Sequence, residues 1–206
     1  KKPLAAYHRL RMTPDYAVNP FDTPLGCRKP LPSHKAFLVN LLSLLATPLD
    51  VTAPADGVPG LIGRAIDLAY EELSDGNHPR LYQPNVLPEL HDLIVHEGIS
   101  RDASTSWWEV VDGLFERGYV HEAQRYAVPL LADVGAQIRQ NKGIQNTYEE
   151  HTINNVWRSL LDAIEAYVIL KEPTRFDLGD AQIVSLDLDE VAPRGGATAD
   201  RQSAVM

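Results

Sequence analysis

Residues 54–172 constrain the fold most, because apolar residues recur there every three or four positions in one helical pattern after another. No stretch of this region shows the strict alternation of a half-buried strand. The sequence therefore predicts a compact all-α unit, with helices over Leu61–Leu73, Val86–His96, Trp107–Arg117, Val120–Gln140 and Tyr148–Leu170.

Local signals set the expected ends of these helices. Capping boxes, Ser106-x-x-Glu109 and Thr147-x-x-Glu150, predict the starts of two of them. Pro129 predicts a kink within the 120–140 helix, and Asn141-Lys142-Gly143 predicts its end.

Shorter segments of α/β character flank the helical region. Tyr16–Val18 is a strand candidate, and Ser33 is expected to cap a helix over His34–Ala46. Ile183–Leu188 is β-branched and mostly apolar, as expected of a buried central strand. We therefore expect an α/β fold that is mostly α by content: residues 1–53 and 173–206 form a core, and residues 54–172 form an inserted all-α domain.

The best candidate for chemistry is the acidic end of the second strand, Asp187-Leu188-Asp189-Glu190. Acids at the carboxyl end of a buried strand stand where α/β proteins bind ligands. In a P-loop ATPase one acid holds Mg²⁺ and the next activates the attacking water, so we assign Asp189 to the metal, through water, and Glu190 to catalysis. Asp187 shares the face of Asp189 and is a further cofactor-binding candidate. Acids that merely solvate a strand end are the alternative reading.

Asn19-Pro20-Phe21-Asp22 also follows a strand candidate. We expect the two strands to lie parallel, with Asp22, Asp189 and Glu190 at one sheet edge, because the helical region supplies the long crossover that parallel strands need. The alternative is a turn in which the asparagine and aspartate accept hydrogen bonds from the local backbone.

A phosphate-binding loop of the Walker A type is absent from the sequence. The nearest glycine run, Gly57–Arg64, carries arginine instead of lysine and does not follow a strand. We therefore expect the chain to be a fragment of a P-loop ATPase that holds the Walker B end of the site, and we expect it to bind no ATP or Mg²⁺ on its own.

Other residues give weaker indications. The single cysteine, Cys27, excludes an internal disulfide and is expected to be an inert thiol. The net charge of −9 argues against direct nucleic-acid binding by this chain. Of Trp107 and Trp108, one is expected to pack inward and the other is a partner-contact candidate. Arginines near the acids are finger candidates or plain surface charges: Arg175, Arg194 and Arg201.

Several motifs, in order along the chain, resemble the IcmB/DotO ATPases of type IVB secretion and their TraU-type conjugation relatives. The similar segments are Asn19–Arg28, Trp107–Asp112, Gln124–Leu131, Leu186–Ala192, Gly195-Gly196 and Ala199–Gln202. The resemblance implies a partial RecA/FtsK-like core with a large all-α insertion. It also implies a hexameric motor, peripheral at the cytoplasmic face of a bacterial inner membrane, that works with other secretion or conjugation components.

Two other functions stay open. The helical region could be a protein-interaction module of the secretion machinery with no catalytic role. A stand-alone metal-dependent hydrolase using Asp187 and Asp189 would need a further ligand group that the sequence does not display.

Overall fold

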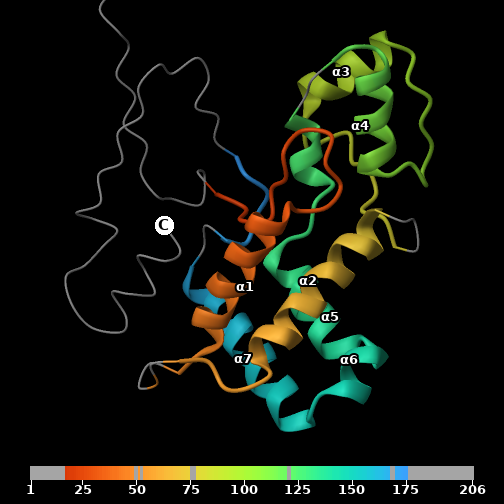
Figure 1. The fold of residues 1–206 in the computed structure, drawn as a ribbon. Coiled ribbons are helices and arrows are strands. Elements are labelled where there is room, and N and C mark those ends of the chain that lie inside the picture. The colour runs from red at the N-terminus through yellow and green to blue at the C-terminus, as the bar shows by residue number, and fades with distance from the viewer. Residues whose placement is uncertain are drawn as a thin grey trace, which may run out of the picture.

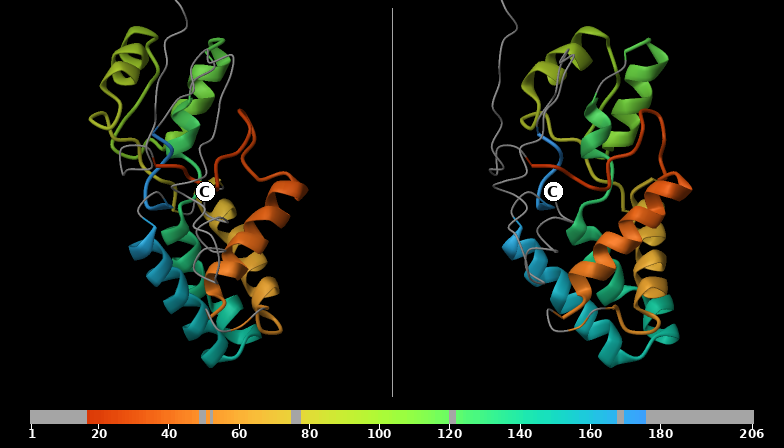
Figure 2. Two further views of the ribbon diagram at one scale, coloured as in Figure 1. Left: turned by 90° about the vertical axis from the view of Figure 1, so that its left-hand side faces the viewer. Right: turned by 60° about the vertical axis from the view of Figure 1, so that its left-hand side comes forward.

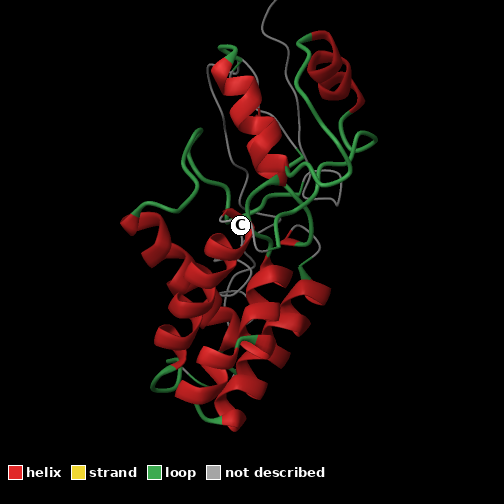
Figure 3. Cartoon of the chain, turned by 90° about the vertical axis from the view of Figure 1, so that its right-hand side faces the viewer, coloured by secondary structure: helices red, strands yellow, loops and turns green. Residues whose placement is uncertain are grey.

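The computed structural model describes residues 17–48, 51, 53–74, 78–119, 122–167 and 170–175. The regular elements in this part of the chain are all helices, and Figure 3 shows them joined by loops. The elements are α1 (Pro32–Ala46), α2 (Val58–Ser74), α3 (Pro88–His96), α4 (Trp107–Glu116), the 3₁₀ helix η2 (Glu122–Tyr126), α5 (Leu131–Gln140), α6 (Lys142–Thr147) and α7 (Glu150–Ala166).

The predicted mostly helical content is therefore confirmed. Within the described ranges the only β pairing is an isolated antiparallel bridge between Leu81 and Ser106. None of the helices there is long and apolar enough to cross a membrane. The predicted strand at Tyr16–Val18 is not seen at residues 17 and 18, which have no strand geometry.

Four helices form the main bundle. α2 packs against α1 and α5, and α7 packs against α5 and α1, while the short α6 closes one end (Figure 1). α3 and α4 form a separate lobe at the opposite end, as both views of Figure 2 show. The 3₁₀ helix η2 contacts α4 and leads back from this lobe to the bundle.

The apolar spacing of the sequence explains why these helices bury one face. α2 turns Leu61, Ile62, Ala65, Ile66 and Ala69 into the core, each at most 1% exposed. Burial of each such leucine or isoleucine side chain stabilises the fold by roughly 1.5–3 kcal/mol.

The hydrophobic core also includes α1. Leu38, Leu41, Leu42 and Leu45 of α1 belong to one cluster of buried side chains with those of α2 and α7. Residues before 54 thus share a core with residues after it. The division of the whole chain at residues 53 and 172 stays a prediction.

Some helix boundaries differ from the expected ones. α1 starts at Pro32 with no side-chain cap, so the capping role predicted for Ser33 is wrong; the fixed φ of Pro32 suits the first helical position. The capping box of α4 is confirmed, because Ser106 Oγ accepts from Glu109 N and Glu109 accepts from Ser106 N.

The single kinked helix predicted over Val120–Gln140 is wrong. The described part of this stretch contains η2 and α5, and the chain between them is extended at Leu130. The Thr147 capping box is also wrong. Thr147 belongs to α6, and its hydroxyl donates to Gly143 O, so α7 begins without a side-chain cap.

Candidate functional site

The predicted Walker B residues Asp187, Asp189 and Glu190 lie outside the described residues, as do Arg194 and Arg201. The strand Ile183–Leu188 and the sheet edge that it would share with Asp22 therefore stay predictions. Asn19-Pro20-Phe21-Asp22, Arg175 and the two adjacent tryptophans lie inside the described ranges.

Asn19-Pro20-Phe21-Asp22 forms a tight turn. Asp22 N donates to Asn19 O at 3.2 Å, and Phe21 N donates to the side-chain Oδ1 of Asn19 at 3.2 Å. An asparagine that accepts from the backbone two residues on is the usual Asx turn. For Asn19, the turn interpretation is thus confirmed.

Asn19 also bonds to two segments that are distant in the sequence. Its Nδ2 donates to Pro129 O at 2.8 Å, and its backbone N donates to the Thr174 hydroxyl at 2.8 Å. Asn19 is 2% exposed, so each of these bonds is made away from water. Next to it, Arg175 N donates to Ala17 O at 3.0 Å. Residues 17–19 and 174–175 are therefore neighbours, although the whole helical region lies between them in the sequence.

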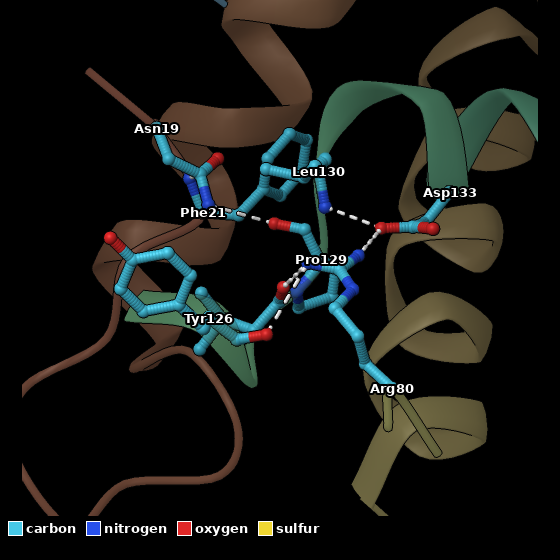
Figure 4. Close-up of polar contacts among 8 residues, drawn as sticks. Asn19, Phe21, Arg80, Tyr126, Pro129, Leu130 and Asp133 are labelled. Atoms are coloured by element: carbon cyan, nitrogen blue, oxygen red, sulfur yellow. Dashed lines mark hydrogen bonds and ion pairs between the residues drawn. The ribbon is translucent and has the colours of Figure 1, made fainter. Parts of the chain in front are cut away.

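Arg80 holds the same loop from the other side (Figure 4). Its guanidinium donates to Val128 O at 3.1 Å and to Tyr126 O at 3.5 Å, and it pairs with the carboxylate of Asp133. Asp133 in turn accepts from Leu130 N at 2.7 Å. These bonds and the Asn19–Pro129 bond fix the extended segment between η2 and α5, which explains why Pro129 stands between two helices and not within one.

A pocket of about 760 Å³ opens beside this junction. Its walls include the aromatic rings of Trp107 and Tyr126, which stack at 4.9 Å between centroids. Arg80, Arg125, Arg175 and Glu172 also line it. Arg80 pairs with Asp133 and Arg175 pairs with Glu172 at 3.1 Å, so much of the positive charge is already balanced.

Phe21 anchors the turn in the core. It is fully buried, and its carbonyl oxygen accepts from the Tyr70 hydroxyl at 2.5 Å. Burial, with a smaller contribution from the nearby negative charge of Asp22, raises the pKa of Tyr70 well above its ordinary value. Tyr70 is therefore a neutral hydrogen-bond donor at physiological pH.

Gln124 holds the loop that follows the turn. Its Nε2 donates to Thr23 O, Thr23 Oγ1 and Pro24 O at 2.8–3.1 Å, and its Oε1 accepts from Gly26 N at 2.8 Å. Gly26 has a φ of +80°, a conformation that a side chain would strain. This loop is thereby fixed against η2, and it carries the partly buried Cys27.

Both tryptophans pack inward, including the one that the sequence offered as a partner-contact candidate. Trp107 and Trp108 are 2% and 5% exposed. Trp107 stands between the rings of Tyr82 and Tyr126, and Arg28 lies over the Trp108 ring, 4.6 Å from its centroid. The adjacent residues point to different sides of α4, and both sides are covered.

Among the described residues, no group of three or more histidine, cysteine, aspartate or glutamate side chains is arranged to hold a metal ion. Comparisons of the chain with family models, with curated proteins and with solved structures gave no match.

The roles of Arg80, Gln124 and Thr174 were not predicted from the sequence. Their partners lie 46 or more residues away along the chain, and local patterns carry no sign of them. The role of Asp133 could have been predicted. An acidic side chain at the third position of a helix typically accepts from the backbone N of the residue just before the helix, as Asp133 does from Leu130 N.

Proposed function

We propose that this chain supplies the helical insertion and the Walker B segment of a motor ATPase in a conjugation or type IVB-like secretion system. The proposal rests on the IcmB/DotO resemblance, which places the candidate acids 187–190 after the helical region. In it, Asp189 holds Mg²⁺ through water, Asp187 supports it, and Glu190 activates the water that attacks ATP.

The observation that supports the proposal most is the meeting of residues 17–19 with residues 174–175. A helical block that starts and finishes at one point can be inserted into a sheet protein without separating the strands on either side. The chain before residue 17 and the chain after residue 175, which carries the candidate acids, then leave this block from adjacent points.

The proposed motor is a hexamer, peripheral at the cytoplasmic face of the inner membrane, that powers DNA or protein transfer with other machinery components. Its RecA/FtsK-like core includes the phosphate-binding loop that this sequence lacks.

Hydrolysis by the motor that contains this chain tests the proposal. Glu190→Gln should lower the rate of ATP hydrolysis about 100-fold or more, since a positioned general base contributes 10²–10⁴. ATP binding should persist. Glu165→Gln, at an exposed position on α7, is the matched control and should leave the rate unchanged. A Glu190→Gln rate within twofold of the wild type would remove Glu190 from the mechanism.

A protein-interaction role is the second candidate. Leu25 and Phe115 are each about half exposed, and a Cβ placed on Gly26, the residue after Leu25, would lie 3.7 Å from the Phe115 ring. Two neighbouring apolar side chains of this size suit a protein contact. Under this reading, Leu25→Ser with Phe115→Ser would abolish binding to an inner-membrane component while leaving hydrolysis intact.

A further inference from the structure

The outer face of α1 carries no charged residue. Its exposed positions are Pro32, Ser33, Ala36, Phe37 and Asn40. The one charged residue of the helix, Lys35, is partly buried and pairs with Asp67 at 2.6 Å. Each other described helix of eight or more residues exposes at least one charged side chain: Arg64 in α2, Asp92 in α3, Glu116 in α4, Arg139 in α5 and Arg158 in α7.

Large apolar groups are exposed on this side. Phe37 and Leu31, just before the helix, are each 51% exposed, although the opposite side of α1 is already buried in the bundle. The outer side of α1 is therefore uncharged, with the polar Ser33 and Asn40 beside the large apolar ring of Phe37, as expected of a helix side that apolar side chains can cover. Burial of a charged side chain without a partner costs free energy. In a chain with a net charge of −9, apolar side chains can therefore cover an uncharged face at lower cost than a charged one.

We propose that the apolar face of the segment 183–188 covers α1. Side chains alternate along a strand, so Val184, Leu186 and Leu188 share one face, and Ile183, Ser185 and Asp187 share the other. The first set is wholly apolar and suits an uncharged face on which Phe37 is the large apolar side chain. With this set against α1, the face that carries Ser185, Asp187 and Asp189 is turned away from the helix, and Glu190 lies beyond the end of the docked segment.

The path of the chain brings the segment within reach. Phe37 stacks on His34 at 6.4 Å, and the His34 ring contacts Pro20 O at 2.8 Å. Pro20 follows Asn19, which is bonded to Thr174. From Arg175 to Ile183 there are eight residues, which span up to about 26 Å when extended. α1 is about 22 Å long at 1.5 Å per residue, so most of its length is accessible to the segment.

The docking rests on the proposed function in that it involves the same strand, but it requires neither the binding nor the hydrolysis of ATP. Loss of hydrolysis in Glu190→Gln and failure of docking are therefore separate results. A second copy of the chain on the α1 face is the competing occupant, and the experiment distinguishes it.

Cysteine pairs in the full chain test the docking. In a Cys27→Ser background, Phe37→Cys is combined singly with Val184→Cys, Leu186→Cys, Leu188→Cys, Ser185→Cys or Asp187→Cys, and disulfides are formed under mild oxidation. Intrachain bonds should form at least fivefold more with positions 184, 186 and 188 than with 185 and 187. Equal yields on both faces, no intrachain bond, or bonds mainly between chains would each overturn the proposal; the last would identify a second copy.

A second arm separates docking from general damage to the fold. With Asn40→Cys as the probe, Phe37→Asp should abolish the preference for 184, 186 and 188. Leu161→Asp, which puts the same charge at a 40% exposed leucine of α7, should leave the preference intact. Circular dichroism checks that both variants keep their helices. A preference that survives Phe37→Asp would contradict docking on this face.

Discussion

Asn19 is the residue on which the junction depends most. Its side chain satisfies Pro129 O and Phe21 N, and both bonds are buried. Asn19→Ala leaves two buried backbone groups without partners at about 1–3 kcal/mol each, so we expect the free energy of unfolding to fall by about 3 kcal/mol.

Urea unfolding followed by circular dichroism measures this change. Asn146→Ala, at an exposed position of α6, is the control and should shift stability by less than about 0.5 kcal/mol. If Asn19→Ala cost as little as the control, the junction would not depend on this side chain.

Tyr70 should make the fold sensitive to alkali. Its pKa is raised in the folded state, mainly by burial, so its stabilising contribution is complete below its unfolded pKa of about 10 and is lost as pH rises above that value. Tyr70→Phe removes the bond to Phe21 O and should cost about 1 kcal/mol at pH 8.

By pH 11 the wild type should have lost about 1.4 kcal/mol through this group, because one pH unit is worth that amount. The stability gap between the two proteins should therefore close between pH 10 and 11, as read from urea midpoints. Since all other groups titrate alike in both proteins, a gap that stays constant over this range would rule out the buried neutral tyrosine.

Among the helices, the capping-box pattern appears twice in the sequence, but only one of the two copies caps a helix. Ser106 caps α4, whereas the Thr147 hydroxyl bonds within α6. Ser106→Ala should therefore destabilise the protein by about 1 kcal/mol, and Thr147→Ala should cost less than about 0.5 kcal/mol. Thermal unfolding of the two variants side by side checks the order, and a reversed order would contradict the assigned helix starts.

Apolar spacing predicted the main helices well, because burial of one face is encoded locally. The α6 helix was missed because Asn141-Lys142-Gly143 suggested a break. The Asn141 side chain instead caps a new helix by accepting from Gly143 N and Ile144 N. The separation of η2 from α5 was missed for another reason: Asn19 and Arg80 hold the intervening loop from 110 and 48 residues away.

For the whole molecule, the meeting of residues 17–19 and 174–175 predicts tolerance of circular permutation. A chain in which a short glycine linker joins Arg175 to Ala17, with new ends within the exposed stretch 53–57 before α2, should unfold cooperatively and keep its helical content. The matched control opens the chain inside α2, between Ala65 and Ile66, and should lose cooperativity. A permutant of the first kind that fails to fold while the control folds would contradict the junction.

In the described part of the chain, the same junction is where the first and last segments meet. The bonds of Asn19 to Thr174 and to Pro129 O hold residues 17–19 and 174–175 against the loop between η2 and α5. A small rotation applied at this loop would therefore swing the α3–α4 lobe and the far end of the bundle together. Displacement grows with distance from such a pivot, while the apolar contacts inside the bundle are left undisturbed. In mechanical terms the block is a lever arm, and its fulcrum is a buried asparagine.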